Sequence, residues 1–235
     1  MTESLIYITL SIFDCLAYIF LILTLYMLPV WNYRYRILSF ALFIAVFSYT
    51  MRIVLELPKF DLALQYIFLV VFLRFCMKIK THIAAFIGGA GLTCYITLQM
   101  FFYYSFNLMG AVPQNAIEYN TGYSVYAIQV SSIAMAYIIA TLLFITRKGF
   151  TFIIAPPHDF LIREDYSTTT NKLMILGSIF SIVTVALTLT LLYTSNFIWL
   201  VSMCVVTMLC SLYFSLRSDQ ADVRKNLESY RKRNM

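Results

Sequence analysis

Long apolar runs constrain this chain more than any other feature of its sequence. An α-helix needs about 20 apolar residues to cross the hydrocarbon core of a bilayer. Seven stretches of the sequence approach or exceed that length: Leu5–Leu28, Ile37–Leu57, Leu62–Met77, His82–Met109, Tyr123–Thr146, Leu173–Thr194 and Phe197–Leu216. They predict an all-α integral membrane protein, a bundle of about seven transmembrane helices.

The rest of the chain is too small to hold a soluble domain. Of the 235 residues, 61% are hydrophobic and 12% are charged, whereas a soluble domain is roughly a quarter charged. We therefore expect a polytopic bundle over residues 1–216 and a short basic cytoplasmic tail helix over residues 217–235.

Basic residues predict how the bundle sits in the membrane. With seven spans, one set of loops and the tail hold almost all the lysines and arginines, and the other set holds Lys59, with Arg52 nearby. Because Lys and Arg are retained on the cytoplasmic side, the N-terminus should be outside and the C-terminus inside, in a multi-pass protein of the cell membrane. The net charge of +6 then suits contact with anionic lipid, and no nucleic-acid partner is needed to explain it.

Three charged residues lie within predicted spans, where charges are costly and usually face the bundle interior with a partner. Arg52 and Glu56 are four residues apart, so we expect them to share a helical face, and Asp14 could reach Arg52 from the first span. Two interpretations stay open: an ion pair that fixes helix packing, or a polar pocket that faces outward.

Other polar side chains occur at a similar depth in the fourth and fifth spans. Gln99, Tyr126 and Gln129 could join Asp14, Arg52 and Glu56 in a ligand site open to the outside. They could equally form hydrogen bonds between helices.

Two further stretches carry structural expectations. Gly88, Gly89 and Gly91 predict close helix packing in the fourth span, with a hinge as the alternative. The segment from Phe150 to Lys172 begins apolar and turns polar, which predicts an interfacial segment followed by a flexible loop.

Catalytic chemistry is not indicated. His82 and Cys94 would lie about 18 Å apart along one helix, and His158 with Asp159 lacks the spacing of a metal site. The five cysteines fall within or at the ends of apolar spans, which favours buried, inert thiols. We expect no enzyme activity, no metal and no cofactor.

The tail has the seam of a heptad repeat, in which Leu216 and Gln220 are followed by Val223, Leu227 and Tyr230. Ser218 could cap the start of this helix, and Asp219 suits its first turn. Two roles are open for the tail: a basic segment resting on the membrane, or a helix that pairs with a second copy or with a signalling partner through Val223, Leu227 and Tyr230.

Tyr- and Phe-rich spans, short basic loops and a last span that runs into SLRSDQADVRKNLESYRKRN resemble the membrane sensor region of agr-type Gram-positive quorum-sensing histidine kinases. The resemblance implies a bundle of six or seven spans that takes a peptide pheromone from outside and continues through a dimerising helix into a kinase. The sequence has no phospho-acceptor histidine after the last span and no ATP-binding region. We therefore expect a bacterial receptor-like protein without kinase activity, which binds a peptide or lipophilic ligand and acts through a partner. The alternative is a small transporter or an export accessory protein.

The predicted orientation can be tested with a reporter that is active only in the cytoplasm. Fused after Met235 it should be active, and inserted between Met109 and Tyr123 it should be silent, because the basic loops keep the tail inside. Reporter activity in cells is the measurement. The reverse pattern would overturn the orientation, and activity at both sites would overturn the number of spans.

Overall fold

The computed structural model describes residues 2–113, 116, 121–153, 156, 158, 167–192 and 197–233, and within them the regular structure is helical. A 3-10 turn, η1 (Trp31–Tyr33), precedes the second α-helix, and a π-helical turn, η2 (Thr50–Val54), follows it. The α-helices of this part of the chain are α1 (Thr2–Leu25), α2 (Arg34–Tyr49), α3 (Pro58–Phe75), α4 (Thr81–Leu108), α5 (Tyr123–Thr146), α6 (Thr169–Leu192) and α7 (Phe197–Arg233).

Each predicted span overlaps an α-helix, although the second, Ile37–Leu57, runs past the end of α2. The overlap confirms the all-helical architecture. Five helical segments in the described residues are long and apolar enough to cross a membrane: Glu3–Leu25, Trp31–Val54, Thr81–Leu108, Tyr123–Thr146 and Trp199–Arg224. In α6 the apolar part is shorter, at Asn171–Leu187. Helix α3 carries Asp61 in its first turn and Arg74 in its last, so charges limit its apolar length. A multi-pass membrane protein with these five candidate spans follows.

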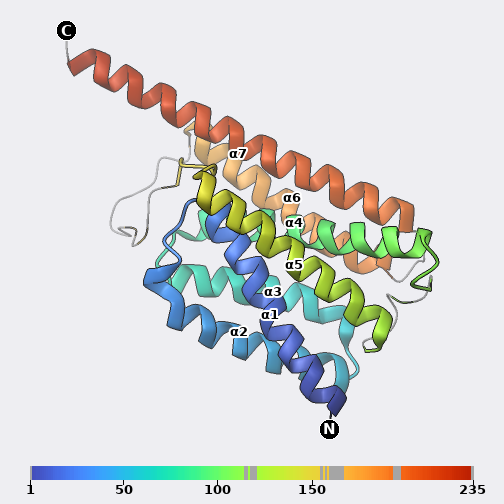
Figure 1. Ribbon diagram of the computed structural model, residues 1–235. Helices are drawn as coiled ribbons and strands as arrows, with labels where there is room; N and C mark the ends of the chain where they lie inside the picture. Colours follow the sequence, from blue (N-terminus) through green and yellow to red (C-terminus); the bar gives the residue numbers. More distant parts are fainter. Residues whose placement is uncertain are drawn as a thin grey trace.

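Consecutive helices run in opposite directions, so their connections gather at two ends of the bundle (Figure 1). At the end that holds the N-terminus, the Tyr49 hydroxyl donates to Ser4 Oγ at 3.2 Å. At the other end, Phe150 N donates to the carbonyl oxygen of Leu25 at 2.8 Å. We call these the N-terminal end and the opposite end. The predicted basic loops lie at the opposite end, and the predicted outer loops at the N-terminal end.

Helix α4 forms the centre of the bundle and packs against α1, α3, α5, α6 and α7. Its glycines allow this close approach. A Cβ atom on Gly91 would lie 2.0 Å from Ile22 Cγ1 of α1, and one on Gly89 would lie 2.3 Å from Ser181 Cβ of α6. The prediction of close packing is therefore confirmed, and α4 runs without a break from Thr81 to Leu108.

The apolar start of the segment after α5 belongs to the core. Phe152 and Ile153 are buried, and the Phe152 ring lies edge-on against Tyr26, with ring centroids 6.1 Å apart. The prediction of an interfacial segment is therefore wrong for these two residues, because they pack against protein near the ends of α1 and α4 and not against lipid. Most of the polar part of this segment lies outside the described residues.

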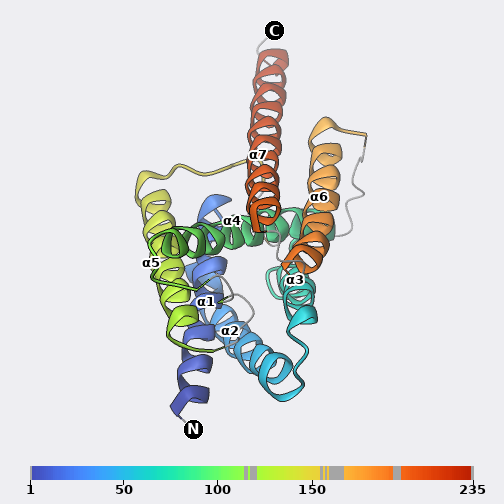
Figure 2. The same cartoon turned by 90° about the vertical axis from the view of Figure 1, so that its right-hand side faces the viewer.

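Helix α7 spans 37 residues, about 55 Å at the rise of an α-helix, and its C-terminal part projects beyond the other helices (Figure 2). No separate helix begins at Ser218, which is buried inside α7. Asp219 does not start a helix either: Thr151 N and Oγ1 both donate to its Oδ1 at 2.8 Å. The tail is therefore a continuation of the last span, anchored where it leaves the bundle.

The packing of α4 predicts a difference between two of its glycines. Gly91→Ala should destabilise the protein by about 1–3 kcal/mol, the usual cost of overpacking, because the added methyl group overlaps Ile22. Gly88→Ala is the matched control, since its Cβ would meet Leu69 Cδ2 at an ordinary 3.4 Å. Melting temperature in mild detergent is the measurement, and equal melting temperatures for the two variants would contradict this packing.

Candidate ligand site

A cavity of about 180 Å³ lies inside the N-terminal end of the bundle. Helices α1 to α5 and the η2 turn supply its walls, together with Ala116 of the α4–α5 connection. Its polar lining includes Ser48, Gln65, Gln99 and Gln129, and its charged lining is Asp14 and Arg52. A polar chamber thus sits within helices that are otherwise apolar.

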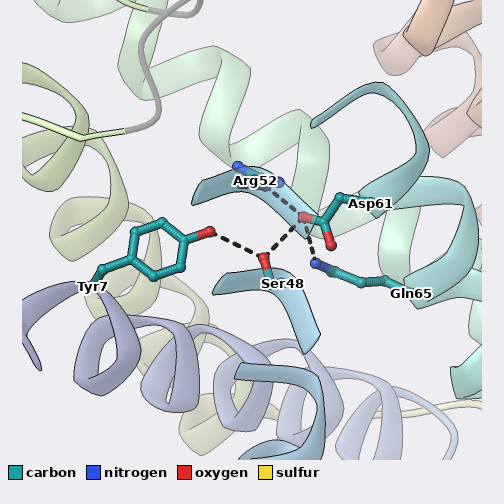
Figure 3. A network of polar contacts seen from close by, with 5 residues as sticks. All are labelled: Tyr7, Ser48, Arg52, Asp61 and Gln65. Atoms are coloured by element: carbon teal, nitrogen blue, oxygen red, sulfur yellow. Dashed lines mark hydrogen bonds and ion pairs between the residues drawn. The ribbon is translucent and has the colours of Figure 1, made fainter. Parts of the chain in front are cut away.

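One wall of the cavity is built around a buried carboxylate, Asp61 (Figure 3). Arg52 Nε forms an ion pair with Asp61 Oδ2, and the same oxygen accepts hydrogen bonds from Ser48 Oγ at 2.9 Å and Gln65 Nε2 at 3.0 Å. Tyr7 extends this network to α1, because its hydroxyl lies 3.0 Å from Ser48 Oγ. Helices α2 and α3 and the η2 turn are thereby joined through one oxygen atom, and α1 is joined to them through Ser48.

The chain reaches this geometry through an irregular helix end. Leu55 N donates to the carbonyl oxygen of Thr50 at 2.9 Å, the wider ring of a π-helix, which is often found at functional sites. Glu56 then takes a left-handed conformation with φ +54°. Pro58 opens α3, where its missing N–H costs nothing. This turn brings Asp61 back to Arg52.

The expected pairing of Arg52 with Glu56 is wrong. That prediction assumed an α-helical repeat through residue 56, but α2 ends at Tyr49 and Glu56 lies exposed beyond the η2 turn. The ion-pair partner of Arg52 is Asp61. The predicted third span began at Leu62, so Asp61 was left just outside it. An acidic residue three positions after a proline is typical of the first turn of a helix, and this signal could have placed Asp61 in α3.

The second carboxylate, Asp14, is held by neutral groups. Its Oδ1 accepts hydrogen bonds from the Tyr95 hydroxyl and from Gln99 Nε2, the latter at 3.3 Å. Gln129 on α5 hydrogen-bonds to the same carboxylate. Arg52 attracts Asp14 through space, although its ion pair is with Asp61.

The structure thus brings together four of the six residues predicted for a ligand site: Asp14, Arg52, Gln99 and Gln129 all line the cavity. Glu56 and Tyr126 do not line it. Within the described residues, the Tyr126 hydroxyl is buried without a hydrogen-bond partner.

The residues predicted for partner binding lie on the projecting part of α7. Val223 is 48% exposed and Leu227 is 64% exposed. The backbone of Tyr230 continues the helix, while its side chain lies outside the described ones. An exposed apolar stripe is therefore present at Val223 and Leu227.

Among the described residues, no group of three His, Cys, Asp or Glu side chains could hold a metal ion. The cavity contains one thiol, Cys15, which donates to the Tyr18 hydroxyl at 3.2 Å. No protein-family model, curated protein or solved structure matches the chain. Its function is therefore inferred from the cavity.

The Asp61 network predicts which double substitution restores stability. Arg52→Leu leaves Asp61 buried without its cation, and removing one member of a buried ion pair costs roughly 3–5 kcal/mol. The lower end applies here, because the Arg52 side chain is 36% exposed. Arg52→Leu/Asp61→Leu should recover most of the loss, measured as melting temperature and as the yield of monodisperse protein in detergent.

The matched control is Arg52→Leu/Glu56→Leu, which should remain as unstable as the single variant because Glu56 is exposed. Recovery in this control, but not in the Asp61 double variant, would assign the ion pair to Glu56 and contradict the network.

Proposed function

We propose that this chain is a receptor-like, multi-pass protein of a bacterial cell membrane, which binds a ligand in the α1–α5 cavity from outside and acts through a partner protein. The cavity itself carries the proposal. Burying polar groups in a membrane bundle is costly unless they form hydrogen bonds, and those inside the bundle often serve a function. Here six elements direct polar side chains into one chamber. The chamber lies at the end where the sequence predicts the outer loops.

The size of the cavity limits what it can hold. At about 180 Å³ it is smaller than the roughly 300–1,000 Å³ of most small-molecule pockets. It suits a small ligand, or one side chain or terminus of a peptide whose remainder stays at the bundle surface. This narrows the peptide or lipophilic ligand expected from the sequence to one that presents a compact polar group.

A physical route leads from the cavity to the tail. Helix α4 supplies Tyr95 and Gln99 to the cavity and also packs on α7, where Thr97 Oγ1 donates to the carbonyl oxygen of Cys204 at 3.3 Å. Helix α7 continues unbroken into the projecting stripe of Val223 and Leu227. A ligand that shifts α4 would move α7, the element that resembles the dimerising helix of sensor kinases.

A small transporter is the second candidate, and one observation favours it. The second span ends in the π-helical η2 turn, which contains Arg52, and irregular helix segments line the substrate sites of many transporters. A transporter would expose the cavity alternately to both sides of the membrane, whereas a receptor would expose it to one side.

The sidedness of Ser11, which lines the cavity, separates the two functions. In a chain whose five cysteines are replaced, Ser11→Cys should react with a membrane-impermeant thiol reagent in intact cells and not in inverted vesicles. Mass shift of the purified protein is the measurement. Reaction from both sides would favour the transporter. Reaction from neither side would show that the cavity is closed to both sides and would overturn both proposed functions.

Two single-cysteine controls calibrate this experiment. Leu108→Cys reports whether the reagent reaches the N-terminal end, because Leu108 is 69% exposed at the end of α4. Lys148→Cys reports the opposite end, where Lys148 follows α5 and is exposed. If Lys148→Cys is the one labelled in intact cells, the orientation is reversed.

A further inference from the structure

We propose that the cavity selects a cationic group, a small amine or the ammonium end of a larger ligand, and seats that group against the Asp14 carboxylate. This rests on the proposed function only in taking the cavity as a ligand site. It adds the chemical class of the ligand, which follows from the charges, the hydrogen bonds and the walls of the cavity.

The charges around the cavity do not balance. Arg52 is the cation that lines it, and its ion pair is with Asp61, which is fully buried behind the wall. Asp14 is the second charged residue of the lining. One positive and two negative charges leave a net charge of −1 at the cavity among the described residues.

The hydrogen bonds to Asp14 hold it in place without neutralising it. Its donors, Tyr95, Gln99 and Gln129, are all neutral. A carboxylate inside a membrane bundle ordinarily has a charged partner, and for Asp61 that partner is Arg52. An ammonium group in the cavity would give Asp14 the equivalent partner.

The aromatic walls favour the same sign of charge. Tyr7, Tyr18, Tyr95 and Tyr103 all line the cavity, and the Tyr18 and Tyr95 rings lie 6.0 Å apart on α1 and α4. The face of an aromatic ring attracts cations within about 6 Å. A cation that enters the cavity would therefore lie among aromatic rings beside Asp14, whereas an anion would be repelled by Asp14 and attracted by Arg52, whose charge is already paired with Asp61.

The charge preference can be measured at Ser11→Cys in the full-length, otherwise cysteine-free chain. The probes are two thiosulfonate reagents of similar size, trimethylammonium MTSET and sulfonate MTSES. The rate of reaction with MTSET is divided by the rate with MTSES, and this ratio is normalised to the same ratio measured at Leu108→Cys. Leu108 lies at the same end of the bundle, outside the cavity. Because a nearby unit charge shifts the local concentrations of the two reagents in opposite senses, the normalised ratio should exceed about tenfold in favour of MTSET.

Asp14 is tested by a matched pair of variants in this background. Asp14→Asn should bring the normalised ratio within about twofold of unity, while Asp14→Glu, which keeps the charge, should preserve the preference. A normalised ratio near unity in the parent chain, or a preference for MTSES, would overturn cation selection while leaving the cavity as a ligand site. Absence of reaction with both reagents would instead overturn the proposed function.

A reversible probe needs no substitution of Asp14. Butylamine, added at constant ionic strength, should slow the reaction of Ser11→Cys with a neutral thiosulfonate by at least about threefold. The size-matched butanol and butyrate should not slow it, because they lack the charge that Asp14 would pair with. Equal effects of all three compounds, or no effect of any of them, would overturn the proposal.

Discussion

The Asp61 carboxylate holds α2, α3 and the η2 turn together at the N-terminal end of the bundle. Its Oδ2 accepts from Arg52, Ser48 and Gln65, and Tyr7 joins the network through Ser48. A charge buried in this way is tolerated only with a close partner and further hydrogen bonds. The η2 turn places Arg52 within reach of Asp61. The irregular end of α2, the position of α3 and one wall of the cavity therefore depend on a single interaction.

The packing of α4 is the second constraint, and it acts without any charge. Gly91 accommodates Ile22 of α1, and Gly89 accommodates Ser181 of α6. Helices in lipid gain little from hydrophobic burial against each other, so close backbone approach supplies much of their association. Because α4 packs against five other helices, it holds its polar residues Tyr95 and Gln99 at a fixed depth. The cavity thus has one wall set by electrostatics and another set by shape.

Hydropathy and spacing predicted much of this arrangement, for identifiable reasons. Long apolar runs located each helix, and Asp14, Gln99 and Gln129 were recognised because a polar residue within a regular span stands out. Glu56 was misplaced because the π-helical turn breaks the four-residue repeat on which its pairing with Arg52 depended. Asp61 was missed because it follows Pro58 in a segment that looks like a loop. Phe152 was misjudged because an apolar segment outside a span can meet either lipid or protein, and only the tertiary fold decides between them.

The position of α4 also limits how binding at the cavity could reach the tail. A ligand shifts an equilibrium only by the difference in its affinity for two states, so those states must differ at Asp14 and its donors. Two of the donors, Tyr95 and Gln99, belong to α4, while the third, Gln129, belongs to α5. Neutralising Asp14 with a cation would weaken its hold on these donors and alter the contact between α4 and α5. Helix α7 packs on α4, and Asp219 fixes it to Thr151 in the segment that follows α5. A relative movement of α4 and α5 would therefore act on α7 at two separated points, which is the arrangement needed to tilt a long helix.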